Sequence, residues 1–151
     1  MRVTVVAVGR ARHEGIAAAI GDYEGRAARY WNLDVREIRE ERGSDPAVVR
    51  RMEGKRLAEA VGQRPFVACD EGGRSYTSAD FAGWMRDSRD FSRDVTFVLG
   101  GAFGLDQSIA EQAAVRLSLA PWTLPHELAR LVLAEQLYRA GTILRGEPYH
   151  K

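Results

Sequence analysis

The residues most able to do chemistry lie in the last third of the chain, at two junctions where an apolar run gives way to a helix. The first run, 97–99, ends in the glycine-rich segment 100–104. Glycines at the end of a strand let the backbone turn sharply and approach a ligand closely. The second run, 115–119, leads through a short loop to Pro125, His126 and a long apolar helix. Ligands of open α/β sheets bind outside the carboxyl ends of the strands, so two adjacent junctions predict a cofactor site.

Several familiar site motifs are incomplete here. Segment 100–104 has neither the G-x-G-x-x-G spacing of a dinucleotide fingerprint nor the Lys-Ser or Lys-Thr pair of a P-loop. His126 and Glu127 begin like a zinc-protease helix, but Arg130 replaces the second histidine. Neither Ser108 nor Ser118 lies in a G-x-S-x-G elbow. The sequence therefore predicts no phosphate cradle, no metal ion and no hydrolase triad.

The elements that must position these junctions alternate between strands and helices. We expect strands at 3–8, 33–38, 66–69 and 95–99, with a fifth near 115–119. Helices are expected at 16–31, at 46–61, from about residue 78 onwards and at 125–140. This alternation predicts an α/β fold, with an open, mostly parallel sheet and helices on both of its faces. A chain of 151 residues with 45% hydrophobic content favours a single domain over residues 1–151.

Charge and cysteine content limit the partners and the compartment. The 22 basic residues nearly cancel the 21 acidic ones, so a polyanion such as RNA must meet a local patch rather than a global field. The single cysteine, Cys69, excludes a disulfide framework and favours the reducing cytoplasm. The amino-terminal apolar run is read as a first strand rather than a signal peptide, and no segment is apolar for long enough to span a membrane.

Two basic regions are candidates for contact with phosphates. The arginines of 36–56 alternate with glutamates, which favours a solvated face stabilised by ion pairs and leaves a phosphate-contacting surface as the alternative. The carboxyl-terminal tail combines cations with aromatic rings, a composition that holds phosphates and stacks bases. Its members are Tyr138, Arg139, Arg145, Tyr149, His150 and Lys151.

The last long helix has more apolar residues than one narrow stripe requires. Leu128, Leu131, Val132, Leu133 and Leu137 cover a broad face, so this helix is either deeply buried or shared with a second subunit, and we favour a homodimer. On the same helix His126 and Arg130 lie one turn apart on one face, and Glu135 and Arg139 form an i,i+4 pair.

Four segments together resemble one family over the whole chain. They are V-x-V-V-A-V-G at 3–9, F-V-L-G-G-x-x-G-L at 97–105, T-L-P-H-x-L-x-R-x-x-L-x-E-Q-L-Y-R-A at 123–140 and G-E-P-Y-H-K at 146–151. In this order they resemble the RlmH-type enzymes of the SPOUT superfamily, which methylate N3 of a pseudouridine in 23S ribosomal RNA. The resemblance implies an S-adenosylmethionine cofactor, a carboxyl-terminal trefoil knot that holds it, and assembled ribosomes as the substrate.

The resemblance also implies where the cofactor binds. Its site would include Cys69, Gly100 and the loop between the last strand and the last helix. The members of that loop are Leu119, Ala120, Pro121, Trp122, Thr123 and Leu124. Two residues depart from the family pattern, because Cys69 stands where leucine is usual and Phe103 stands where a small or polar residue is usual.

The implied reaction needs a group that handles a proton, because N3 of pseudouridine carries one at neutral pH. His126 and His150 are the candidates, although His126 could instead cap its helix. Arg130, Arg139 and Lys151 are candidates for holding phosphates or offsetting charge at the base, and Tyr149, His150 and Lys151 for binding substrate. Two other readings stay open: a non-catalytic ribosome-associated protein, and a nucleotide-dependent enzyme of the doubly wound class.

Overall fold

The computed structural model describes residues 1–150, and its centre is one sheet of five parallel strands. The strand order is β2-β1-β4-β3-β5, and every neighbouring pair is parallel. The strands are β1 (Arg2–Val8), β2 (Asn32–Ile38), β3 (Val67–Ser75), β4 (Val95–Leu99) and β5 (Val115–Ser118). All five strands expected from the sequence are therefore present, and the expectation of an α/β fold with a parallel sheet is confirmed.

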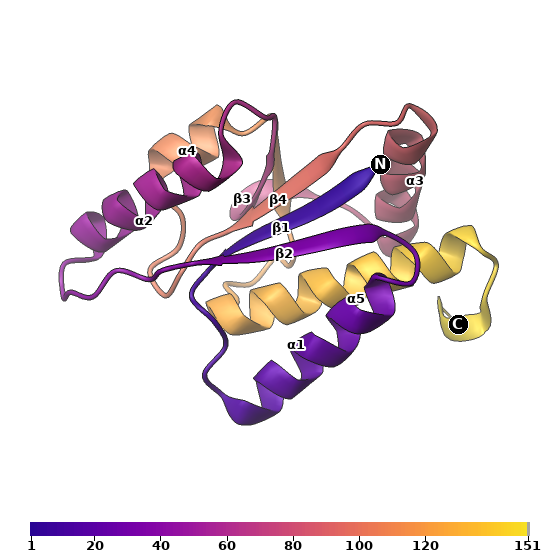
Figure 1. Cartoon of the computed structure of the whole chain (residues 1–151), viewed down its shortest axis with the longest axis horizontal. Helices are drawn as coiled ribbons and strands as arrows, with labels where there is room; N and C mark the ends of the chain where they lie inside the picture. The colour runs from indigo at the N-terminus through magenta and orange to yellow at the C-terminus, as the bar shows by residue number, and fades with distance from the viewer. Residues whose placement is uncertain (151) are drawn as a thin grey trace.

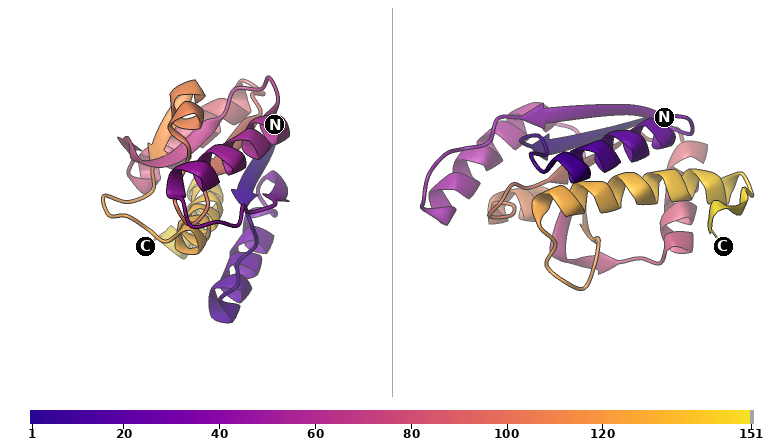
Figure 2. Two further views of the ribbon diagram at one scale, coloured as in Figure 1. Left: turned by 90° about the vertical axis from the view of Figure 1, so that its left-hand side faces the viewer. Right: turned by 90° about the horizontal axis from the view of Figure 1, so that it is seen from below.

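Helices cover both faces of this sheet (Figure 1). One face carries α1 (Glu14–Ala27), α3 (Ser78–Asp90) and α5 (His126–Leu144). The other face carries α2 (Pro46–Val61) and the short α4 (Gln107–Gln112). Figure 2 shows α1 and α5 lying side by side along the sheet, with a final 3-10 turn, η1 (Pro148–His150), beyond the end of α5.

The two cores follow from the alternation of side chains along each strand. Val3 and Val5 of β1 pack toward α1, α3 and α5, whereas Val6 and Val8 pack toward α2 and α4. Successive side chains of a strand point to opposite faces, so a strand covered on both faces has to be apolar throughout. This explains why β1 and β4 stand out in the sequence as unbroken apolar runs.

The ends of the helices show where local sequence signals predict a helix boundary and where they do not. Helix α2 has the predicted bounds, because Asp45 accepts a hydrogen bond from the Ala47 N–H at 3.0 Å and Pro46 occupies the first turn. Helix α1 ends at Ala27 rather than near residue 31. Trp31 instead lies outside the helix and donates its indole N–H to the Leu137 carbonyl oxygen of α5 at 2.8 Å. This buried tertiary contact left no mark on the helical periodicity.

Strand β3 departs most from the expectation, because it continues well beyond Cys69. Its pairing with β5 shifts between Cys69 and Arg74, and both of these residues pair with Leu117. The intervening residues bulge out of the ladder at the carboxyl edge of the sheet. Gly73 allows β3 to pair again with β5 after the bulge, since a Cβ at this position would lie only 2.6 Å from the Arg116 carbonyl carbon. The bulge therefore brings Asp70 and Glu71 to the edge where a ligand site was predicted.

Candidate functional site

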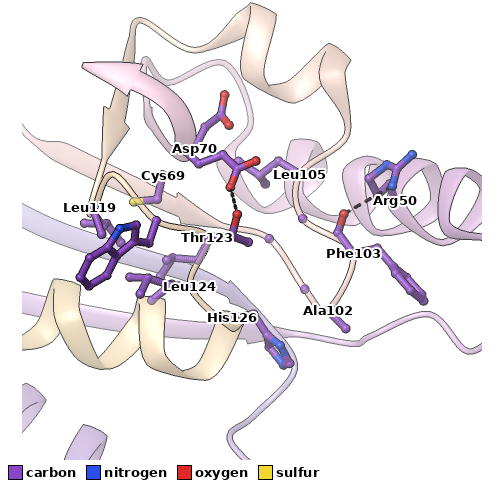
Figure 3. Close-up of a pocket in the computed structure, with 18 residues that line it drawn as sticks. Arg50, Cys69, Asp70, Ala102, Phe103, Leu105, Leu119, Thr123, Leu124 and His126 are labelled. Carbon is purple, nitrogen blue, oxygen red and sulfur yellow. Dashed lines mark hydrogen bonds between the residues drawn. The ribbon is translucent and has the colours of Figure 1, made fainter. Parts of the chain in front are cut away.

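A cavity of about 450 Å³ lies at the carboxyl ends of β3, β4 and β5 (Figure 3). Its wall is built from three segments: residues 69–71 in the bulge of β3, the loop 99–105 at the end of β4, and the loop 119–124 after β5. Arg50 of α2 and His126 and Ala129 of α5 complete the wall. The structure thus brings both predicted junctions to one site.

The glycine loop, residues 100–104, needs its glycines for close approach. A Cβ on Gly100 would lie 2.6 Å from the carbonyl carbon of Gly104, which is closer than side chains approach backbone. The Gly104 N–H closes the turn by donating to the Gly101 carbonyl oxygen at 3.0 Å, and Gly104 has a φ of +82°. The turn therefore exposes main-chain atoms rather than side chains to the cavity.

The loop after β5 covers another side of the cavity. Ser118 donates its hydroxyl to the Ala120 carbonyl oxygen at 2.7 Å, which fixes the start of this loop. Leu119 and Leu124 are half-buried, whereas Trp122 is 79% exposed. In Figure 3 Leu119, Leu124 and Cys69 are grouped on one side of the cavity, opposite Arg50. The cavity therefore has an apolar side and a polar rim.

Cys69 lines the cavity with an uncharged thiol. Burial raises the pKa of its thiol to about 12. The thiol consequently stays protonated at neutral pH and behaves as a small apolar side chain rather than as a nucleophile. The nearby carboxylates are Asp70, which is paired with Arg116, and Glu71. This side of the cavity is thus suited to a ligand with both apolar and cationic parts.

His126 is the first residue of α5, and its half-buried side chain lines the cavity. Pro125 holds the N-cap position, and no side chain makes a capping hydrogen bond there. The alternative that His126 caps this helix is therefore wrong. Its side chain forms part of the cavity wall and is labelled in Figure 3.

Arg130 is placed elsewhere, between α5, α1 and β2. Its guanidinium donates to Glu24 at 2.8 Å and to Glu37 at 2.8 Å, and the residue is only 8% exposed. Burial opposes the charge of the guanidinium, but the bonds to the two carboxylates leave the pKa of Arg130 above its ordinary value. Arg130 does not line the cavity, and its described contacts hold α5 against the rest of the fold.

The tail residues gather on the carboxyl-terminal half of α5. Tyr149 packs its ring 4.5 Å from that of Tyr138, and its hydroxyl lies 3.2 Å from that of Tyr23 and 3.1 Å from Glu135. Arg139 pairs with Glu135 and lies 4.9 Å from the Tyr149 ring centre. Burial and the bond to Tyr23 raise the pKa of Tyr149. His150 is exposed, and Lys151 lies outside the described residues.

Within one chain, then, the predicted site residues form two groups. Cys69, Gly100, the 119–124 loop and His126 surround the cavity, although Pro121 of that loop is not in its wall. Arg139, Tyr149 and His150 form the second group, on the carboxyl-terminal half of α5, where Tyr149 contacts Glu135 and Arg139 about 14–20 Å along the helix from His126.

Sequence reasoning did not single out Arg50, Asp70 or Glu71 as wall residues. Asp70 and Glu71 would have required recognition of the β3 bulge, and the Gly72-Gly73 pair was the available signal. Arg50 is one of many arginines that alternate with glutamates, and only the fold distinguishes it from the others.

Residues 1–150 contain neither a membrane-spanning helix nor a cluster of metal-binding side chains. No helix in this range combines the length and the apolar character needed to cross a membrane. Nor do three or more His, Cys, Asp or Glu side chains of these residues gather into a group suited to a metal ion.

Comparison with known proteins places this fold and cavity in a defined class. The family described as "Predicted SPOUT methyltransferase" matches residues 1–150. The chain belongs to the SPOUT methyltransferase family. Its curated relatives are named "Ribosomal RNA large subunit methyltransferase H". One from Gemmatimonas aurantiaca is 58% identical over 100% of both chains, and one from an Anaeromyxobacter species is 46% identical, again over 100% of both.

Solved structures agree with this assignment at the level of the fold. A probable methyltransferase from Bordetella pertussis superimposes with a TM-score of 0.55 at 14% identity, covering 92% of this chain and 95% of that one. The tRNA (m1G37) methyltransferase from Aquifex aeolicus gives a TM-score of 0.53 at 13% identity, covering 92% of this chain and 70% of that one.

Proposed function

We propose that this protein is an S-adenosylmethionine-dependent methyltransferase that methylates N3 of a pseudouridine in 23S ribosomal RNA. The observation that carries the proposal is the cavity formed by the β3 bulge and the loops after β4 and β5, in a chain of the SPOUT methyltransferase family. The names of the relatives support ribosomal RNA as the substrate. The pseudouridine N3 as acceptor rests on the family resemblance of the sequence.

The cavity suits this cofactor in size and in chemistry. Its volume of about 450 Å³ is within the range that encloses small organic ligands. The apolar side chains can enclose the faces of an adenine ring, and the exposed main chain of the loops can bond its edge. Glu71 offers a negative charge to a cationic ligand, whereas the charge of Asp70 is offset by Arg116. The residues present therefore fit S-adenosylmethionine.

Bound S-adenosylmethionine would supply an already activated methyl group. The task of the protein is then to hold donor and acceptor in line and to exclude water. The glycine loop and the 119–124 loop would provide the alignment. His126 supplies an imidazole to the cavity wall, and we assign it the role of accepting the N3 proton.

The rim of the cavity supports an RNA substrate. Phe103 is 41% exposed and Trp122 is 79% exposed, and both belong to cavity loops. Exposed rings beside a pocket can stack unpaired bases. The net charge of +1 provides little general attraction to RNA, so we propose that assembled ribosomes, with their additional shape and protein contacts, are the substrate.

We further propose a homodimer in which the tail acts on the cavity of the other copy. The tail contacts α5 at Glu135 and Tyr138, about 14–18 Å along the helix from His126 in the cavity wall, and we propose that it reaches a base in the cavity of the other copy rather than in its own. A second copy would also cover Leu128, Leu131 and Val132, which are only half-buried in one chain. His150 and Lys151 would then contact substrate. Arg139 and Tyr149, which contact each other, would support the tail.

Three further parts of the proposal concern the chain as a whole. We propose that residues 1–151 work as one domain, and that the segment containing the 119–124 loop threads through a trefoil knot, as the family resemblance implies. A ribosomal substrate also supports action in the cytoplasm. We also keep Arg130 as a candidate for offsetting charge during the reaction.

The test is methyl transfer from labelled S-adenosylmethionine to ribosomes that lack the modification, with free ribosomal RNA in parallel. Label on pseudouridine N3 in assembled ribosomes, located by mass spectrometry, is the expected result. Cofactor binding without any label would mean that the acceptor is wrong. No binding of S-adenosylmethionine would favour the non-catalytic ribosome-associated protein, and thermal stabilisation by NAD or ATP instead would favour the nucleotide-dependent enzyme.

A mixing experiment tests the shared site. A chain lacking residues 149–151 is combined with a full chain that carries L119R in the cavity wall. Each variant alone should be inactive, whereas their mixture should regain transfer, because hybrid dimers pair an intact cavity with an intact tail. If hybrid dimers form without regaining activity, the tail does not act across the dimer.

A further inference from the structure

Glu53 of α2 buries a carboxylate beside the cavity loops and leaves one of its oxygens unpaired. The residue is only 3% exposed. Its Oε2 accepts a hydrogen bond from the Glu41 N–H at 3.0 Å. Its Oε1 has no hydrogen-bond partner among residues 1–150. A buried oxygen of this kind lowers stability, since it loses its water and gains no donor in return.

The unpaired oxygen faces the start of the glycine loop. A Cβ on Gly101 would lie 2.8 Å from Glu53 Oε1 and 3.0 Å from Val8 Cγ1. The carboxylate therefore occupies the space that a side chain at Gly101 would need, and the glycine loop packs against the carboxylate. The carboxylate of Glu53 therefore contacts two segments. Glu41 belongs to the segment that follows β2, and Gly101 to the segment that follows β4, beside Val8 at the end of β1.

Two neighbours of Glu53 on α2 contact later parts of the same loop. Gly54 allows close approach, because a Cβ there would lie 3.1 Å from the Cβ of Asp106, the N-cap of α4. Arg50 makes a long hydrogen bond of 3.5 Å to the Phe103 carbonyl oxygen. Residues 50, 53 and 54 share one helical face. This face of α2 thus lies against the glycine loop at Gly101 and Phe103, and against Asp106 just beyond the loop.

We propose that Glu53 is a positioning residue for the proposed transfer, whose carboxylate sets the glycine loop in the conformation that binds the cofactor. Folding alone does not account for an unpaired buried carboxylate, since an uncharged side chain of the same shape would cost less to bury. Strain or unsatisfied groups that persist at a site are typical of positions kept for function at the expense of stability. This inference rests on the proposed function for the identity of the ligand.

The first experiment compares E53Q with wild type in two measurements. Glutamine keeps the shape and can still accept the Glu41 N–H, but it removes the charge and presents an amide to Gly101. We expect the Kd for S-adenosylmethionine to rise about tenfold, which corresponds to about 1.4 kcal/mol. We expect the Tm of the ligand-free protein to stay the same or rise. A purely structural role predicts a lower Tm, and unchanged affinity would equally overturn the proposal.

S-adenosylhomocysteine, which lacks the positive charge at sulfur, separates positioning from direct charge attraction. If Glu53 acts by setting the loop, E53Q weakens both ligands by the same factor. A loss confined to S-adenosylmethionine would overturn positioning. The matched control is E59Q, an exposed glutamate of the same helix, which should bind like wild type. If the wild-type protein binds neither ligand, the proposed function fails. If the wild-type protein binds both ligands and E53Q binds them equally well, only the role of Glu53 fails.

A double-mutant cycle tests the contact itself. G101A should weaken cofactor binding, because its new Cβ collides with the carboxylate. E53D withdraws the carboxylate by one methylene, so adding E53D to G101A should restore part of the affinity. Residues in contact show such non-additive effects, whereas independent ones add. Simple addition of the two losses, with both variants folded by circular dichroism, would show that Glu53 does not act through Gly101.

Discussion

Thr123 donates its hydroxyl to a carboxylate oxygen of Glu71 at 2.5 Å, and this bond joins the loop before α5 to the bulge of β3. The two residues come from neighbouring strand ends, and both line the cavity. The bond therefore closes one side of the site without using the main chain of either strand. Because both side chains are exposed, we expect it to influence the loop more than the fold.

Removing this bond should loosen the cofactor loop. T123V keeps the shape of the side chain but lacks the hydroxyl, so we expect the Kd for S-adenosylmethionine to rise by about two- to tenfold, the range of one net hydrogen bond. Isothermal titration calorimetry provides the measurement. T123S, which retains the hydroxyl, should bind like wild type. A loss in T123S with unchanged binding by T123V would assign the effect to packing of the methyl group instead.

Cys69 provides a pH-dependent reporter of the cavity, because it is the only cysteine. Its pKa of about 12 means that the reactive thiolate is scarce at neutral pH. Alkylation by iodoacetamide should accelerate about tenfold per pH unit through pH 10, where an unperturbed thiol has already levelled off. Saturating S-adenosylmethionine should slow the reaction further. A rate that levels off near pH 9, as in the urea-unfolded chain, would contradict the burial of this thiol.

The same shift predicts how stability depends on pH. The folded-state pKa of Cys69 is raised, so the thiol contributes stability that is complete below the unfolded value near 9 and is lost as pH rises toward 12. C69A lacks this titration, and the stability of its folded state should fall less steeply than that of wild type across this interval. Urea unfolding at pH 8 and pH 10 compares the two. If the free energy of unfolding falls equally in wild type and C69A, the loss of stability at alkaline pH comes from groups other than Cys69.

Arg130 should behave as a structural residue when it is replaced. R130M leaves Glu24 and Glu37 without their partner, and we expect the free energy of unfolding to fall by about 2–3 kcal/mol, less than for a fully buried pair because both carboxylates reach solvent. Urea denaturation measures this loss. A variant that stays as stable as wild type but cannot transfer the methyl group would instead place Arg130 in the reaction.

The sequence was sufficient for features that depend on local physics. Apolar runs identified the strands, and Asp45 with Pro46 set the start of α2. The glycine-rich segment and the Pro125-His126 junction predicted the edge of the sheet where the cavity lies.

Features that depend on distant contacts were not predictable in this way. The end of α1 depends on Trp31 bonding to α5, and α4 is too short to show periodicity. The partners of Arg130 come from helices and strands about a hundred residues away in the chain, at separations of 106 and 93. Likewise, nothing local distinguishes Glu53 from the other glutamates of α2, because its importance arises only where α2 meets the glycine loop.

Phe103 should contribute to substrate binding rather than to cofactor binding. Its ring is exposed at the cavity rim, while its carbonyl oxygen holds the contact with Arg50, so a change of side chain leaves that contact in place. For F103A we expect the KM for ribosomes to rise at least about fivefold, the lower range for loss of one base stack, with an unchanged Kd for S-adenosylmethionine. Steady-state methyl transfer measures the KM for ribosomes, and calorimetry measures the Kd for S-adenosylmethionine.

Two control variants test this role of the ring. F103W should retain activity, because it keeps an aromatic face. F91A removes a ring that is 68% exposed beyond α3 and does not line the cavity, so it should leave both constants unchanged. If F103A weakens the cofactor as strongly as it weakens the ribosome, the ring acts on the glycine loop and not on the RNA.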